Sequence, residues 1–233
     1  HLLNSISFGR GTIPARFVST TPGRLPLRLT GPLHPDSMAV MPTDRDDDLL
    51  LKIGRATLLL VTGRWTLILA SGHSDRCFMD LVNLAFHEAG HLFLTPLGET
   101  MHFFGGSLGQ LFVPALLIAY FLLRRPSLTG AAFCTWWLGK SLVNVAYYMA
   151  DARELAMPLV GGGVHDWNWI FYRFDLLDEP SVDFISGLTH GIGVIVMMTG
   201  LAWIGFFLLP LPVREWIVER IPAVLRDLYP FAD

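Results

Sequence analysis

The stretch His87-Glu88-Ala89-Gly90-His91 decides how the rest of the chain is interpreted. It lies inside the apolar run 78–94, which predicts a helix. Positions i and i+4 share one face of a helix, so the two histidines can bind one metal ion together. Glu88 lies beside them and could accept a proton from a metal-bound water. The alternative is a pair of buried histidines and an unrelated glutamate, but burying three ionisable groups without a metal is costly. The pattern therefore favours zinc.

The composition is typical of a membrane protein with several spans. Of 233 residues, 52% are hydrophobic and 16% are charged, and the mean hydropathy is +0.46. The net charge of −3 and the lack of a basic stripe give no indication of nucleic-acid binding. Cys77 and Cys134 both lie in apolar segments and indicate neither a disulfide framework nor a cysteine-type zinc site.

Apolar segments of membrane-spanning length predict an all-α membrane protein, a bundle of four to five transmembrane helices. Four segments are clear: about 76–95, 107–123, 129–151 and 182–209. The segment 49–70 is interrupted by charges and could be a helix or a hairpin that turns at Gly63; we favour the helix.

The two ends of the chain differ from this central part. Residues 1–48 begin with an arginine- and proline-rich stretch and are expected to be a disordered or non-native leader, with translation starting at Met38 or Met41. Residues 49–210 form the predicted transmembrane domain. Residues 211–233 mix charged and apolar residues at helical spacing, which predicts a C-terminal amphipathic helix at the membrane interface.

If the four clear segments alternate in direction, most other metal-capable groups gather at one end of the bundle, called here the mouth. Asp151, at the end of the third segment, is the preferred third zinc ligand because a hard oxygen completes a two-histidine site. His165, Asp166 and His190 stay open as alternatives. Each also has a plain structural role available, as a loop residue, a helix cap or an interhelical hydrogen bond.

Spacing also predicts an ion pair. Asp80 and His91 are eleven residues apart, as are Lys140 and Asp151, so each pair shares one helical face. A lysine in mid-membrane is costly unless it is paired. We therefore expect Lys140 to bind Asp80 and the two helices to pack side by side, with Asn83 and Asn144 between the pair and the zinc.

These motifs resemble those of the site-2 protease family of intramembrane zinc metalloproteases, over about residues 77–152. The shared order is His87-Glu88-Ala89-Gly90-His91, then Gly105-Gly106-Ser107-Leu108-Gly109-Gln110, then Asp151. The resemblance implies that His87, His91 and Asp151 hold zinc and that Glu88 activates water. The chain departs from the family pattern in having Ala150-Asp151-Ala152 in place of Leu-Asp-Gly, and Gln110 where asparagine is frequent.

The expected function is a membrane-embedded zinc metalloprotease that cleaves a peptide or transmembrane protein substrate in the lipid bilayer of a bacterial cytoplasmic membrane. Three alternatives remain. A zinc-dependent lipid amide or ester hydrolase would use the same ligands. A di-iron protein would use Glu88 with His91 and Glu99 with His102, but needs two more glutamates that the later spans lack. The last alternative is a non-enzymatic membrane protein with a degenerate site.

Positive charges predict that the mouth lies outside the cytoplasm. The mouth side carries only Arg153 and Arg173. If 49–70 spans the membrane, Lys52 and Arg55 are expected to join the mouth side, and the family resemblance implies the reverse orientation. The opposite side carries six arginines: Arg76, Arg124, Arg125, Arg214, Arg220 and Arg226.

Overall fold

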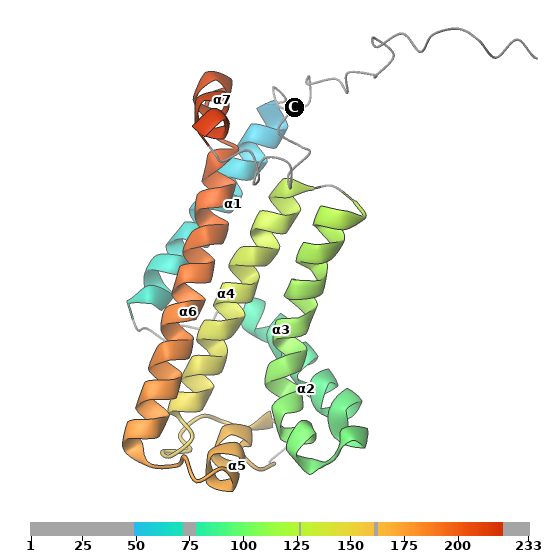
Figure 1. Cartoon of the computed structure of the whole chain (residues 1–233), viewed down its shortest axis with the longest axis vertical. Coiled ribbons are helices and arrows are strands. Elements are labelled where there is room, and N and C mark those ends of the chain that lie inside the picture. Colours follow the sequence, from blue (N-terminus) through green and yellow to red (C-terminus); the bar gives the residue numbers. More distant parts are fainter. Residues whose placement is uncertain (1–48, 72–77, 126, 161–162, 221–233) are drawn as a thin grey trace, which may run out of the picture. The chain divides into compact units, whose positions relative to one another are not determined.

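The structure, a computed structural model, describes residues 49–71, 78–125, 127–160 and 163–220. Regular secondary structure in these ranges is entirely helical, which confirms the all-α class (Figure 1). The expected leader at 1–48 lies outside the described residues. The helices are α1 (Leu49–Ala70), α2 (Phe78–Leu94), a 3₁₀ helix η3 (Thr95–Leu97), α3 (Glu99–Leu123), α4 (Leu128–Ala150), α5 (Asp166–Arg173), α6 (Glu179–Phe206) and α7 (Leu211–Arg220).

Three of the described helices are long and apolar enough to cross a membrane. They are α1, α3 and α6, with 22, 25 and 28 residues. At about 1.5 Å per residue, each exceeds the ~30 Å hydrocarbon core of a bilayer. The chain therefore has the character of a membrane protein, with fewer clear spans than the four to five expected. Because α1 is one unbroken helix over residues 49–70, the hairpin with its turn at Gly63 is wrong.

Close contact between α2 and α3 fixes the position of the histidine motif. The second apolar helix begins at Glu99, earlier than the expected start near 107, so only η3 and Gly98 separate α2 from α3. A Cβ atom on Gly90 would overlap the carbonyl oxygen of Gly105. A Cβ on Gly109 would overlap the carbonyl of Phe86. The two backbones are thus in direct contact, which only glycine allows.

The centre of the bundle is α4. Twelve of its 23 residues are buried, so the surrounding helices cover much of its surface. It packs most extensively against α6, where Gly139 and Gly193 bring the two backbones together. Trp136, Trp137 and Met197 belong to the hydrophobic cluster around this contact. A second cluster lies where α4, α5 and α6 meet.

The ion pair between Lys140 of α4 and Asp80 of α2 is confirmed. Lys140 is only 1% exposed, and Asn144 also donates to Asp80 Oδ1, at 3.3 Å. Asn83 accepts a hydrogen bond from the Trp137 indole at 2.7 Å, which adds a second polar contact between the two helices. The expected side-by-side packing is limited to this polar region, because α2 packs mainly on α3.

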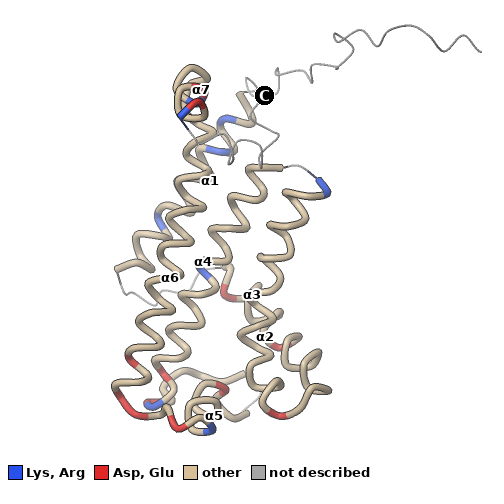
Figure 2. Tube along the Cα trace, in the orientation of Figure 1, with Lys and Arg blue, Asp and Glu red and all other residues tan. Residues whose placement is uncertain are grey.

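Helix α1 runs in the same direction as α4. Near its start, Arg55 Nε donates to the hydroxyl of Thr129 at 3.1 Å, where α4 begins. Near its end, the Leu69 carbonyl accepts from the hydroxyl of Tyr147, close to the end of α4 (3.3 Å). The expected transfer of Lys52 and Arg55 to the mouth side is therefore wrong. Figure 2 shows Lys and Arg near the start of α1, charges of both signs in α7, and mainly Asp and Glu around α5 and the start of α6.

The tail forms a helix, α7, over Leu211–Arg220, but not the expected amphipathic one in this range. Leu211, Val213 and Trp216 are exposed, and charged and apolar residues alternate around the whole helix. A helix without an apolar face has no side that favours the membrane interface. The remainder of the predicted amphipathic segment, 221–233, lies outside the described residues.

The glycine contact between α2 and α3 yields a test with a matched control. Gly105→Ala places a methyl group against the Gly90 backbone, whereas a Cβ on Gly187 of α6 meets no atom within 4 Å. We expect Gly105→Ala to lower the free energy of unfolding by about 1–3 kcal/mol. Gly187→Ala should leave it unchanged or raise it slightly, because alanine favours helix. Thermal unfolding in detergent measures both, and equal stability of the two variants would contradict the contact.

Candidate metal centre

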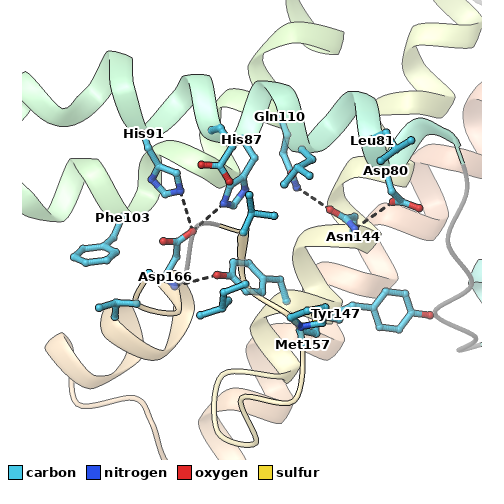
Figure 3. A pocket seen from close by; sticks show the side chains of 18 of the residues that line it. Asp80, Leu81, His87, His91, Phe103, Gln110, Asn144, Tyr147, Met157 and Asp166 are labelled. Atoms are coloured by element: carbon cyan, nitrogen blue, oxygen red, sulfur yellow. Dashed lines mark hydrogen bonds and ion pairs between the residues drawn. The ribbon is translucent and has the colours of Figure 1, made fainter.

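Two histidines of α2 and one aspartate of α5 converge at the mouth. His87 Nε2 lies 3.0 Å from Asp166 Oδ2, and His91 Nε2 lies 3.2 Å from the same oxygen (Figure 3). The three ligand atoms lie within 4.8 Å of one another. Asp166 is buried and the two rings are half-buried.

The donor set and its spacing fit a zinc ion. Two imidazole nitrogens and one carboxylate oxygen are standard ligands, with water as the fourth. Ligand atoms about 2.1 Å from a tetrahedral ion lie about 3.4 Å apart. The distances of 3.0 Å and 3.2 Å are close to that value, so a small outward movement of the side chains would admit the ion.

A carbonyl oxygen orients the ring of His91. Nδ1 of His91 lies 2.7 Å from the backbone oxygen of His102, on α3. A carbonyl only accepts, so Nδ1 carries a proton. Nε2 can donate to Asp166 when the ring is protonated and offers its lone pair to a metal when the ring is neutral. Such a bond from the non-ligating nitrogen is the usual support of a metal-bound histidine. The His102 ring itself points to the Thr95 hydroxyl (2.8 Å) and not to the centre.

The ring of His87 rests against α3 at Gly106. A Cβ atom at Gly106 would overlap the imidazole, so the ring fits only because this residue is glycine. On the other side, the ring of Tyr148 lies 5.8 Å from that of His87, at an angle of 66°. Helices α3 and α4 thus hold the ring from two sides.

Asp166 lies at the start of α5 and is a candidate anionic ligand. Burial raises the pKa of its carboxyl group, but hydrogen bonds from His87 and His91 outweigh this effect, so the pKa lies below its usual value. The first turn of a helix further favours a negative charge. Its backbone N–H donates to the Tyr148 hydroxyl at 3.2 Å, which ties α5 to α4.

The expected ligand Asp151 is not part of this cluster. Its Oδ1 accepts from the backbone N–H of Ala156 at 2.9 Å, and its Oδ2 accepts from that of Met157 at 3.0 Å. Its Oδ2 also lies 3.3 Å from Nε2 of His165, an ion-pair distance without hydrogen-bond alignment. Asp151 therefore shapes the loop that leads to α5, and the structure places Asp166 where Asp151 was expected.

The other two alternatives have structural roles. His165 caps α5, its Nδ1 accepting from Asn168 N at 3.1 Å, and burial holds its pKa below the usual value despite the nearby Asp151 and Asp166 carboxylates. His190 is directed at the Leu69 carbonyl (3.2 Å), a contact between α6 and α1. Of the alternatives left open, only Asp166 joins the two histidines.

A cleft of about 850 Å³ runs from the two histidines to the Asp80–Lys140 pair. On α2 it follows one helical face, with Asp80, Leu84, His87 and His91 spaced by four, three and four residues. Glu88 also lines the cleft and is exposed, as a base that meets water must be. The opposite wall contains Lys140, Asn144, Tyr147, Tyr148 and residues 156–160.

The di-iron alternative finds no support in this geometry. Within the described residues, the metal-capable cluster contains His87, His91 and Asp166 and no glutamate. Glu99, which that alternative requires, is an exposed residue in the first turn of α3. A carboxylate-bridged pair of irons would need several glutamates directed into the bundle.

Comparison of the chain with known protein families, with curated proteins and with solved structures finds no match. The chemistry of the site must therefore be argued from its own residues.

The ligand assignment is tested by metal content. We expect purified protein to bind about one zinc per chain. Asp166→Asn should weaken zinc binding at least a hundredfold, because a neutral amide replaces the anionic ligand. Asp151→Asn is the matched control, since an amide oxygen can still accept from Ala156 N, and its zinc affinity should stay within about tenfold of wild type. Zinc titration with a competing chelator measures both, and the opposite ranking would restore Asp151 as the ligand.

Proposed function

We propose that the protein is a membrane-embedded zinc metalloprotease. The observation that carries the proposal is the convergence of His87 Nε2 and His91 Nε2 on Asp166 Oδ2, at 3.0 Å and 3.2 Å, in a cleft that Glu88 also lines. Two histidines and an acid as ligands, with a free glutamate beside them, are the requirements for hydrolysis by an activated water.

In the proposed mechanism, His87, His91 and Asp166 hold the zinc ion. When bound, zinc lowers the pKa of a water and polarises the carbonyl of the substrate. Glu88 accepts the proton of the attacking water and later gives it to the departing amine. The C–N bond of the peptide breaks, a C–O bond forms, and Glu88 returns to its starting charge.

The far end of the cleft favours a peptide over a lipid. Asp80, Asn144 and Gln110 line it, and Gln110 Nε2 donates to Asn144 Oδ1 at 3.4 Å. A peptide can pair with such groups through its amides. An acyl chain would remove water from them without replacing its hydrogen bonds, which is costly. Lipid amide or ester hydrolysis is therefore the second candidate.

We further infer that α2 and α4 lie within the bilayer together with α1, α3 and α6. Buried α4 is enclosed by helices that are themselves apolar, and α2 carries exposed Leu81, Leu92 and Phe93. A transmembrane substrate would have to unwind locally before its backbone could reach the cleft, since a helix hides its own carbonyl groups. A bacterial cytoplasmic membrane is the location that this proposal implies.

The role of Glu88 gives a direct test. Glu88→Gln should retain zinc, because the residue is not a ligand, and lose at least a hundredfold in turnover, because an amide cannot accept the proton. His87→Ala should lose both. Turnover is measured with a library of quenched fluorescent peptides and, in parallel, with ester- and amide-linked lipids. Full activity of Glu88→Gln would refute the base assignment, and cleavage of lipids alone would refute the protease.

We propose that the mouth faces away from the cytoplasm. Among the described residues, Lys52, Arg55, Arg124 and Arg125 lie at the end opposite the mouth, and basic residues favour the cytoplasmic side. The test uses Gly163→Cys at the mouth and Arg125→Cys at the other end, both exposed positions, in a background without Cys77. In intact cells an impermeant maleimide should label only Gly163→Cys. Labelling of Arg125→Cys alone would reverse the orientation.

A further inference from the structure

We propose that Tyr148 is a catalytic residue whose phenolic O–H donates a hydrogen bond to the peptide oxygen that becomes negatively charged during hydrolysis. This inference rests on the proposed function and adds a residue that neither the motif nor the ligand set contains. It follows from the position of the side chain in the cleft, from its hydrogen bonding and from the hydrogen bonding of the other donors nearby.

Tyr148 is held at the metal centre by three contacts. Its hydroxyl lies 3.2 Å from the backbone nitrogen of Asp166, the residue whose carboxylate faces both histidines. Its ring packs on the His165 ring at 4.1 Å and meets the His87 ring at 5.8 Å. Tyr148 lines the same cleft as Glu88 and the two histidines. The phenol therefore has a fixed position beside the place where a bound carbonyl would react.

The hydroxyl proton of Tyr148 is available for a ligand. In its hydrogen bond with Asp166 the phenol oxygen is the acceptor, so that bond does not use the proton. The hydrogen bonds between described residues include none that the phenol donates. Accepting a bond from a backbone N–H also makes an O–H a stronger donor, because hydrogen bonds in a chain polarise one another.

Other cleft donors are directed elsewhere. The hydroxyl of Tyr147 donates to the Leu69 carbonyl on α1, at 3.3 Å. The amide of Asn144 donates to Asp80 at 3.3 Å, and the amide of Gln110 donates to Asn144 at 3.4 Å. These groups belong to the end of the cleft that contains the ion pair. Tyr148 contacts the metal-binding residues themselves. The His102 ring also does, 4.9 Å from that of His91, but its Nδ1 is directed at the Thr95 hydroxyl (2.8 Å).

The chemical role is stabilisation of charge. When the water oxygen bonds to the carbonyl carbon, the electron pair of the C=O bond moves to the carbonyl oxygen, which becomes negative. Tyr148 donates a hydrogen bond to that oxygen and keeps its proton throughout. The pair returns when the C–N bond breaks and the amine takes the proton held by Glu88. Removing one such donor from a preorganised site typically costs 10²–10³ in turnover.

The experiment compares Tyr148→Phe with Tyr147→Phe in the full chain in detergent. The two tyrosines are neighbours on α4 and line one cleft, but their hydroxyls face different groups. Four quantities are measured: zinc affinity, kcat and KM on the peptide cleaved best in the library, and the Kd of a phosphinic peptide. A phosphinic peptide cannot be hydrolysed. Its tetrahedral phosphorus carries an oxygen at the position where the substrate's carbonyl oxygen becomes negatively charged.

For Tyr148→Phe we expect zinc affinity within threefold of wild type, KM within threefold, kcat reduced about a hundredfold or more, and phosphinic-peptide binding weakened at least tenfold. Tyr147→Phe should be near wild type in all four. If Tyr148 only positions Asp166, the loss will appear as weaker zinc binding and excess zinc will restore kcat, which overturns the inference. Unchanged kcat and phosphinic-peptide binding also overturn it. Cleavage of no peptide by the wild type refutes the protease, and the phosphinic peptide then decides on Tyr148 separately.

Discussion

The site depends on how closely α2 and α3 approach each other. Because Gly90, Gly105 and Gly109 carry no side chain, the two backbones touch at the height of the histidine motif. That contact brings the carbonyl of His102 within 2.7 Å of His91 Nδ1, which orients the ring. It also leaves space at Gly106 for the ring of His87. The hydrogen bond that directs Nε2 of His91 toward the centre is thus a consequence of backbone packing, and larger residues at these positions would remove both the contact and the orientation.

Helical periodicity predicted the parts of the structure that lie within helices. The spacing of His87 and His91 placed both on one face, and the shared interval of eleven residues predicted the Lys140–Asp80 pair, since equal intervals on parallel helices keep two contacts level. The same argument placed Asp151 near the depth of the metal centre. Asp151 does lie close to this depth, because it contacts His165, the residue directly before the candidate ligand Asp166.

Periodicity could not predict what depends on the path of a loop or on the direction of a helix. Residues 152–165 follow no repeat. The sequence therefore could not show that Asp166 faces both histidines, or that the backbone N–H groups of Ala156 and Met157 donate to the Asp151 carboxylate. A helix cap was among the roles that the sequence left open for His165 and Asp166; in the structure His165 is the cap and Asp166 is the acidic first residue of α5. Successive spans were expected to alternate in direction. Helix α1 does not follow this rule, since the contact between Arg55 and Thr129 shows that it runs parallel to α4.

Two helix ends with opposite partial charges meet at the metal centre. The histidines lie toward the carboxyl end of α2, where the partial negative charge of the helix end favours a cation. Asp166 lies at the amino end of α5, where the N–H groups favour an anion. If a divalent cation binds to the two imidazoles and this carboxylate, the end of α2 therefore favours the charge of the cation, and the start of α5 favours the charge of the carboxylate. Asp151 lies at the carboxyl end of α4, where the carbonyl groups disfavour a negative charge. Its carboxylate accepts hydrogen bonds from the N–H groups of Ala156 and Met157.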